Sequence, residues 1–306
     1  MKFLFLGTSA GRPTKTRNVS SLIFQFQNDN KWFLFDCGEA TQHQLLKTSY
    51  SLNKLNSIFI THLHGDHIYG LFGLITTKMM EKSTTPLKIY APRGLEEIIK
   101  SVVDVSLEHL GYEIEFIRIY AGFEEEFDKF KIKVLPLIHS IESYAYYIQE
   151  KDKININEEL LKKDGLMPSK AYKELKEGKE VIVNNKKYSP DKYLLKKAGR
   201  RVIIAGDNAE VDILGKYLNN LDLLIHEATY TQDVFDKLET KYLHTTAKDL
   251  GIVADKYKVR NLIATHISPR YEGYEILEEI KKFYRGNVYV ANDFDMFLLK
   301  ETLIYL

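Results

Sequence analysis

The residues best suited to chemistry lie in residues 57–70, SIFITHLHGDHIYG, where an apolar run ends in three histidines and an aspartate. Imidazole and carboxylate groups are suitable ligands for zinc and other divalent transition metals, and one ion takes three or four of them. A lone histidine at a strand end is usually a structural residue. Four candidates within six residues, His62, His64, Asp66 and His67, favour a metal site instead. They exceed what one ion gathers from a single turn, so the spacing predicts two adjacent metals.

Three further candidate ligands, His139, Asp207 and His266, each follow an apolar segment that we predict to be a strand. In sheets flanked by helices, ligands bind outside the carboxyl ends of the strands, so these residues are expected at the same sheet edge. A two-metal centre needs ligands beyond the first turn and a carboxylate that bridges the ions. These positions supply both.

Short apolar runs bounded by turn residues predict the elements that position these groups. The predicted strands are residues 2–6, 20–26, 31–35, 57–61, 87–90, 114–119 and 130–137, and the predicted helices are residues 40–48 and 95–110. From residue 201 the pattern recurs, because residues 202–208 resemble residues 33–38 in order, and residues 261–266 resemble residues 57–62. The recurrence predicts two related β-rich halves that meet at a shared site, with helices outside.

Composition narrows the class of protein. The chain has 306 residues, a net charge of +1, 44% hydrophobic and 28% charged residues, which is ordinary for a globular protein. The apolar run at the N-terminus is too short for a signal peptide, and no segment is long enough to span a membrane, so we expect a cytoplasmic protein without a membrane partner. Cys37 is the single cysteine. It excludes an internal disulfide and a thiolate cluster, so any metal must be held by His, Asp and Glu.

Residues 151–201 are locally basic, with 15 Lys and Arg against 8 Asp and Glu. Residues 151–197 show little strand pattern and two short helical segments, residues 158–163 and 171–176, so we interpret them as an insertion. Charge alone leaves two interpretations open. One is a solvated helical surface, and the other is a basic arm that meets phosphate.

The chain resembles the metallo-β-lactamase superfamily, in which HxHxDH marks a dinuclear site, and one branch of it, ribonuclease Z, nearly end to end. That branch removes 3′ trailers from precursor tRNA. The motifs that carry the resemblance are FLGTSAG at 5–11, PTKTRN at 13–18, FDCGEATQHQL at 35–45, HLHGDH at 62–67, HEATY at 226–230, HTT at 244–246, THISPRY at 265–271 and AND at 291–293. The resemblance implies an αβ/βα four-layer sandwich of two related halves, with residues 1–306 as a single domain and the arm at about residues 151–197 inserted in it.

The resemblance also implies two Zn²⁺ ions per subunit, with Mn²⁺ or another divalent ion as alternatives. It assigns His62, His64 and His139 to one ion, Asp66, His67 and His266 to the other, and Asp207 as the bridge. Two metals activate a water and balance charge on an in-line phosphodiester transition state. Asp66 is then a ligand and also the candidate general base.

For proton transfer to the departing oxygen, the resemblance implies His244 as a catalytic residue and Glu227 as the group that orients it. His226 precedes Glu227 and is interpreted as structural, and Asp36 as a residue that fixes a ligand imidazole. His43 and His109 fall within predicted helices and receive no chemical role.

Substrate contacts are implied for the loop of residues 13–18, in which Lys15, Arg17 and Asn18 lie, and for Arg270. In this family the inserted arm grips the tRNA body, often across a dimer, so a homodimer is expected. The chain departs from the family pattern in three places: the arm has no Gly-Pro dipeptide, Asn208 stands where threonine is common, and Ala40 stands where glycine is common.

The leading hypothesis is therefore a zinc-dependent endoribonuclease that cleaves precursor tRNA and leaves a 3′-hydroxyl. One alternative is a metal-dependent phosphodiesterase of the same fold that acts on other RNA or on small phosphodiesters. A remote alternative is a non-catalytic RNA-binding protein. A zinc β-lactamase is disfavoured because no secretory signal is evident.

Overall fold

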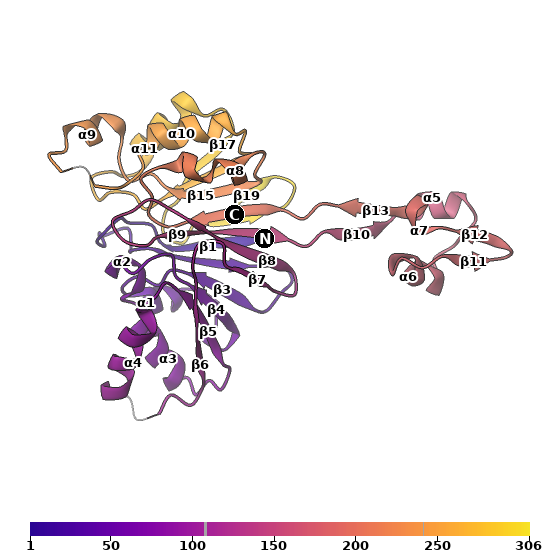
Figure 1. The fold of residues 1–306 in the computed structure, drawn as a ribbon, viewed down its shortest axis with the longest axis horizontal. Helices are drawn as coiled ribbons and strands as arrows, with labels where there is room; N and C mark the ends of the chain where they lie inside the picture. Colours follow the sequence, from indigo (N-terminus) through magenta and orange to yellow (C-terminus); the bar gives the residue numbers. More distant parts are fainter. Residues whose placement is uncertain (107–108, 241) are drawn as a thin grey trace. The chain divides into compact units, whose positions relative to one another are not determined.

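The computed structural model describes residues 1–106, 109–240 and 242–306. These divide into two compact units (Figure 1). The core unit comprises Met1–Glu125, Ile132–Ile148 and Val202–Leu306, and the arm unit comprises Glu126–Lys131 and Gln149–Arg201. No helix in these described ranges has the length and hydropathy to span a membrane.

The first sheet has eight strands in the described chain, in the order β19-β18-β1-β2-β3-β4-β5-β6. The strands are β1 (Lys2–Gly7), β2 (Ser21–Gln25), β3 (Trp32–Phe35), β4 (Leu55–Phe59), β5 (Leu87–Ala91), β6 (Ile114–Arg118), β18 (Met296–Leu299) and β19 (Leu303–Tyr305). Strands β3 to β6 are parallel, and the others pair antiparallel. The parallel strands therefore end at one edge.

The second sheet has seven strands among the described residues, in the order β17-β16-β15-β14-β9-β8-β7. They are β7 (Glu124–Glu126), β8 (Phe130–Pro136), β9 (Tyr144–Glu150), β14 (Arg201–Ala205), β15 (Leu223–Glu227), β16 (Asn261–Thr265) and β17 (Asn287–Val290). Strands β14 to β17 are parallel. The two halves thus each contain a block of four parallel strands, and β3 and β14 are the first strand of their blocks, as the recurrence predicts. The predicted match of residues 57–62 with residues 261–266 differs, because β4 is second in its block and β16 is third.

Helices cover the outer face of each sheet (Figure 1). On the first sheet lie α1 (Thr41–Leu45), η1 (Leu52–Lys54), α2 (Gly65–Ile68), α3 (Leu71–Met80) and α4 (Leu95–Ser106). On the second lie η2 (Val211–Leu214), α8 (Gly215–Leu218), α10 (Ala247–Lys256) and α11 (Tyr274–Phe283), whereas α9 (Gln232–Lys237) has no buried residue and does not cover the sheet. The predicted αβ/βα four-layer sandwich is confirmed.

Strand β4 shows why its residues form a central strand. Successive side chains alternate between faces, and at the end of the strand both faces are buried, so Ile58 and Phe59 are both apolar. Ile58 belongs to the core under the helices, whereas Phe59 stacks on Phe35 at 4.9 Å and meets the ring of Tyr146 from the second sheet at 5.3 Å. The Tyr146 hydroxyl donates to the carbonyl of Ile60 at 2.7 Å. This contact joins the two sheets directly below the predicted site.

Most predicted strands agree with the structure within two residues, and His43 lies in α1 as predicted. Helix α4 ends at Ser106, whereas the prediction extended it to residue 110. Residues 107–108 of that prediction lie outside the described residues. The placement of His109 in a helix is wrong, because it follows the end of α4 in irregular structure.

The arm unit has its own small core. Strand β10 (Lys153–Ile156) pairs with β13 (Leu194–Lys197), and β11 (Val181–Val183) pairs with β12 (Lys186–Tyr188), both antiparallel. The remaining elements are α5 (Glu158–Lys163), α6 (Lys170–Lys176) and α7 (Pro190–Tyr193). Their apolar side chains form one cluster: Leu161, Leu166, Leu175, Val181, Tyr188 and Tyr193. The two predicted helices are confirmed, but the four short strands were missed.

Because Leu161 is fully buried in this cluster, we expect Leu161→Ala to destabilise the arm unit by about 2–4 kcal/mol through lost burial and a cavity. Hydrogen exchange of the arm amides should accelerate while the amides of the two large sheets keep their protection. Leu195→Ala, at a side chain that is 53% exposed, is the control and should change little. Equal acceleration throughout the chain would contradict an independent arm core.

Candidate metal centre

The candidate ligands gather in the core unit, on loops at the carboxyl ends of the parallel strands. The chain leaves β4 at Phe59, passes through His62, and reaches His64, which caps the N-terminus of α2. The first turn of α2 then presents Asp66 and His67. This places all four residues of the HxHxDH motif around one point.

A close backbone contact fixes this turn. The amide of Cys37 donates to the carbonyl of His67 at 2.7 Å, and the amide of Gly70 donates to the carbonyl of Cys37 at 2.9 Å. A Cβ atom on Gly38 would lie 2.3 Å from the carbonyl oxygen of Asp66. Only glycine allows this approach, so the DCG segment after β3 is part of the framework that holds the metal motif.

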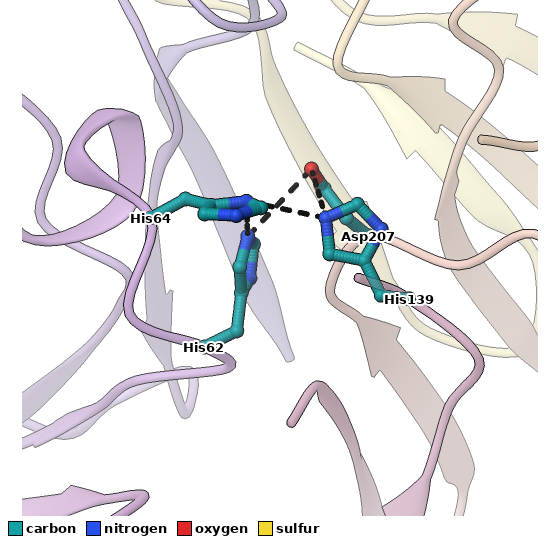
Figure 2. A group of neighbouring side chains, drawn as sticks. All are labelled: His62, His64, His139 and Asp207. Carbon is teal, nitrogen blue, oxygen red and sulfur yellow. Dashed lines mark hydrogen bonds and ion pairs between the residues drawn. The ribbon is translucent and has the colours of Figure 1, made fainter. Parts of the chain in front are cut away.

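The first ligand group consists of His62, His64, His139 and Asp207, whose nearest ligand atoms lie within 4.8 Å of one another (Figure 2). Nδ1 of His64 lies 3.2 Å from Nε2 of His62 and 3.2 Å from Nε2 of His139. Oδ2 of Asp207 lies 3.7 Å from Nε2 of His62 and 3.8 Å from Nε2 of His139. Three nitrogens and one carboxylate oxygen therefore converge, which is the donor set of a tetrahedral divalent site.

The second group consists of Asp66, His67 and His266. Oδ2 of Asp66 lies 3.6 Å from Nε2 of His67 and 3.3 Å from Nε2 of His266. The other oxygen of Asp207, Oδ1, is 3.4 Å from both Nε2 atoms. The two oxygens of Asp207 thus face different groups, which is the geometry of a bridging carboxylate.

Hydrogen bonds on the outer side of four rings set which nitrogen faces inward. Nδ1 of His67 donates to Asp36 at 2.7 Å, and Nδ1 of His139 donates to the carbonyl of Leu243 at 2.9 Å. The other two contacts are Nδ1 of His62 with Thr61 Oγ1 at 3.0 Å and Nδ1 of His266 with Thr229 Oγ1 at 3.1 Å. Each contact leaves the Nε2 lone pair directed at the cluster, as in histidines that ligate metals.

These residues fit a pair of divalent ions. Nε2 of His67 is buried and has no hydrogen-bond partner among the described residues. Burial holds the pKa of His62 well below its ordinary value, so its ring is neutral, the form that binds metal. Burial also opposes the charge of Asp207, but the neighbouring histidines, His266 first, hold its pKa well below the usual value. A buried anion among converging lone pairs requires cations.

Two backbone positions at the site are strained. Asp36, after β3, and His266, after β16, have φ values of 54°, in the left-handed region that non-glycine residues seldom adopt. Asp36 accepts hydrogen bonds from the backbone amide of Thr61 at 2.8 Å and from its hydroxyl at 2.9 Å. One of these turns thus holds a candidate ligand, His266, and the other holds Asp36, which orients the ring of His67.

His244 lies beside this cluster and pairs with a buried carboxylate. Its Nδ1 is 3.0 Å from Oε2 of Glu227 and 3.8 Å from Oδ2 of Asp207. Burial lowers the pKa of His244, but the charge and hydrogen bond of Glu227 outweigh it and raise the pKa to about 9. Asp207, His244 and His266 also form a third possible ligand group. Because Glu227 already occupies Nδ1, the geometry favours a proton donor held by Glu227 over a further ligand.

Other contacts around the site were not predicted from the sequence. The amide of Gly11 donates to Oδ2 of Asp66 at 2.9 Å, which connects the loop after β1 to the candidate base. The hydroxyl of Thr229 lies between Glu227 and His266, at 2.5 Å from Oε2 of the glutamate. Both residues lie in recognisable motifs, but a backbone amide and a hydroxyl carry no metal-ligand signal by which to identify them.

The predicted substrate contacts divide into two kinds. Lys15 is exposed, Asn18 is partly exposed, and the exposed Arg270 places its guanidinium 5.9 Å from the ring of Tyr230, which itself lies 6.2 Å from the ring of His244. Arg17 is different, because it is buried and 5% exposed. The expected phosphate contact of Arg17 is therefore corrected to a structural role.

The guanidinium of Arg17 ties the loop after β1 to the C-terminal part of the core unit. It donates to Thr8 Oγ1 at 2.7 Å and to the carbonyl of Ala291 at 2.6 Å. It also donates at 2.8 Å to the carbonyl of Glu272 and to Oδ1 of Asn292. Its donors are thus used inside the protein.

We expect Arg17→Met to lower the free energy of unfolding by about 2 kcal/mol or more, because it leaves several buried acceptors without a donor. Chemical denaturation would measure the change. Lys15→Met is the control and should stay within about 0.5 kcal/mol of the unmodified chain. If Arg17→Met had wild-type stability and weakened only RNA binding, the phosphate contact would be reinstated.

Comparison with known proteins relates this site to characterised families. The family described as "Anti-Pycsar protein Apyc1" matches residues 1–287. Curated relatives named Ribonuclease Z include those of Marinobacter nauticus, 36% identical over 98% of this chain and 97% of the relative, and of Bacillus subtilis, 37% identical over 91% and 92%. The relative in Shouchella clausii is 39% identical over 99% of this chain and 98% of its own.

Two solved structures are also similar to this chain over nearly its full length. Human tRNase Z, short form (ELAC1), has a TM-score of 0.70 at 26% identity and covers 98% of this chain and 100% of its own. The metallo-beta-lactamase fold protein YhfI from Bacillus subtilis has a TM-score of 0.68 at 20% identity, with 96% and 98% covered. At that identity the second likeness shows the fold alone.

Proposed function

Because the chain belongs to the ribonuclease Z family, and also to the family described as Anti-Pycsar protein Apyc1, we propose that it is a metal-dependent endoribonuclease. Its substrate is precursor tRNA, from which it removes the 3′ trailer by hydrolysis of one phosphodiester bond. The product tRNA ends in a 3′-hydroxyl.

The observation that carries this proposal is the shared carboxylate of Asp207. Its two oxygens face two separate histidine groups, at 3.4 Å for Oδ1 and 3.7 Å for Oδ2. A bridged pair of divalent ions suits in-line displacement at phosphorus, where both the attacking and the leaving oxygen carry charge. We propose two zinc ions per chain, with Mn²⁺ or another divalent ion able to replace them.

The ions, when bound, supply a nucleophile at neutral pH and neutralise charge on the phosphate. Asp66 is the proposed general base, since Oδ2 lies at the mouth of the second group and is held by the amide of Gly11. His244 is the proposed acid, and it delivers a proton to the departing oxygen. Glu227 keeps the ring of His244 oriented and favours its protonated form.

Substrate binding is assigned to groups around and beyond this centre. Lys15, Asn18 and Arg270 are proposed to contact the RNA near the cleaved bond. The arm, with its excess of basic residues, is proposed to hold the tRNA body through phosphate contacts. We further propose that the protein acts as a homodimer in the cytoplasm, as its family resemblance implies.

The test is cleavage of a precursor tRNA that carries a 3′ trailer, with the cut mapped to the nucleotide. We expect Asp66→Ala to abolish turnover and His244→Ala to lower kcat by about 100-fold or more, because each removes a proton-transfer group. His43→Ala is a matched control, since His43 is an exposed helical residue outside the ligand groups. Wild-type cleavage by a folded Asp66→Ala variant would contradict the mechanism.

A second candidate is a phosphodiesterase of the same fold that acts on other RNA or small phosphodiesters. The match to the Apyc1 family supports this second candidate, because the name of that family does not refer to tRNA. We expect kcat/KM for precursor tRNA to exceed that for a small aryl phosphodiester by about 1,000-fold or more, since remote RNA contacts contribute to the transition state. Equal values would support the small-molecule enzyme.

A further inference from the structure

Asn208 directly follows the bridging Asp207 and is fully buried, with 0% of its surface exposed. An amide side chain has one acceptor oxygen and two donor hydrogens. All of these groups have partners here, and so do the backbone amide and carbonyl of the residue. A buried polar residue whose hydrogen-bonding groups all have partners makes its surroundings rigid, and Asn208 does so beside the candidate ligands.

The side-chain oxygen of Asn208 connects the turn that follows Asp207 to the segment that precedes His139. Oδ1 accepts from the amide of Ile138 at 3.1 Å and from the amide of Glu210 at 3.2 Å. The amide of Ala209 donates in turn to the carbonyl of Ile138 at 2.7 Å. The backbone amide and the carbonyl of Ile138, the residue before His139, therefore both bond to the turn after β14.

The side-chain nitrogen of Asn208 contacts His226, which is the one buried histidine among the described residues that belongs to no ligand group. Nδ2 lies 3.0 Å from Nε2 of His226 and donates to the carbonyl of Glu210 at 2.9 Å. Nδ1 of His226 lies 2.9 Å from the carbonyl of Glu227, to which it donates. With Nδ1 donating, Nε2 must accept from Asn208, so the ring is neutral and its free lone pair is occupied.

We propose that Asn208 is a positioning residue that fixes the backbone before His139 and holds the buried ring of His226 in place beside Glu227. Without the Nδ2 donor, His226 would be a buried imidazole with an unoccupied lone pair in the residue next to Glu227. A threonine hydroxyl has a single donor hydrogen and cannot serve both His226 and the carbonyl of Glu210. The inference rests on the zinc pair of the proposed function, and its kinetic part rests on the proposed activity as well.

The test compares Asn208→Leu and Asn208→Thr with Asn219→Leu, a matched change at an exposed asparagine. Zinc per chain is measured by mass spectrometry, and zinc affinity by competition with a chelator. The values of kcat and KM are then measured on precursor tRNA, with circular dichroism to verify folding.

For Asn208→Leu we expect affinity for one of the two zinc ions to fall about 10- to 100-fold, with kcat lowered by a similar factor. KM should stay within about twofold, because RNA contacts are untouched. Asn208→Thr should lose less, since a hydroxyl can still accept from Ile138. Adding His226→Leu to Asn208→Leu should restore part of the zinc affinity, because it removes the buried imidazole that Asn208→Leu leaves without a donor.

Wild-type zinc affinity in a folded Asn208→Leu variant would overturn the inference. So would an equal loss in Asn219→Leu, or no recovery on removal of His226. Should Asn208→Leu fail to fold, wild-type affinity and kcat in Asn208→Thr would overturn it instead. The zinc measurement needs no RNA, so an unmodified chain that leaves precursor tRNA intact would refute the proposed function and not this inference.

Discussion

The rest of the structure depends on one buried anion. The Asp207 carboxylate is 3% exposed and surrounded by histidine nitrogens on both sides. Desolvation of such a charge is costly unless cations or hydrogen bonds compensate it. Converging lone pairs from His62, His64 and His139 would repel one another as well, so the cluster is stable only when positive charge lies within it. Divalent cations held by this cluster would therefore stabilise the fold as well as supply the chemistry.

The two-half architecture is what makes this cluster possible. Each half supplies parallel strands whose carboxyl ends meet at the interface of the sheets, and neither half alone contains a complete ligand set. The aromatic contact of Phe59 with Tyr146 and the hydrogen bond from Tyr146 to Ile60 join the halves below the site. Strained turns at Asp36 and His266 are tolerated because packing and hydrogen bonds hold them.

Most of the candidate ligand set was predictable from the sequence, for identifiable reasons. The HxHxDH turn is a local motif, and His139, Asp207 and His266 each follow an apolar strand. The burial of Arg17 was not predictable, because all hydrogen-bond partners of its guanidinium except Thr8 lie more than 250 residues away in sequence. The arm strands were missed because β10 and β13 are separated by nearly the whole arm, and the alternation of β10 (KINI) covers only four residues while β13 (LLKK) has none. Asn208 was noted only as a departure from the family pattern, because its role depends on contacts that no local pattern encodes.

The central claim is that Asp207 bridges two metal ions. Anomalous diffraction at the zinc edge from crystals of the zinc-loaded protein tests it most directly. The account predicts two anomalous peaks, one among His62, His64 and His139 and one among Asp66, His67 and His266, with a different oxygen of Asp207 directed at each. A single peak, or two peaks that Asp207 does not join, would contradict it.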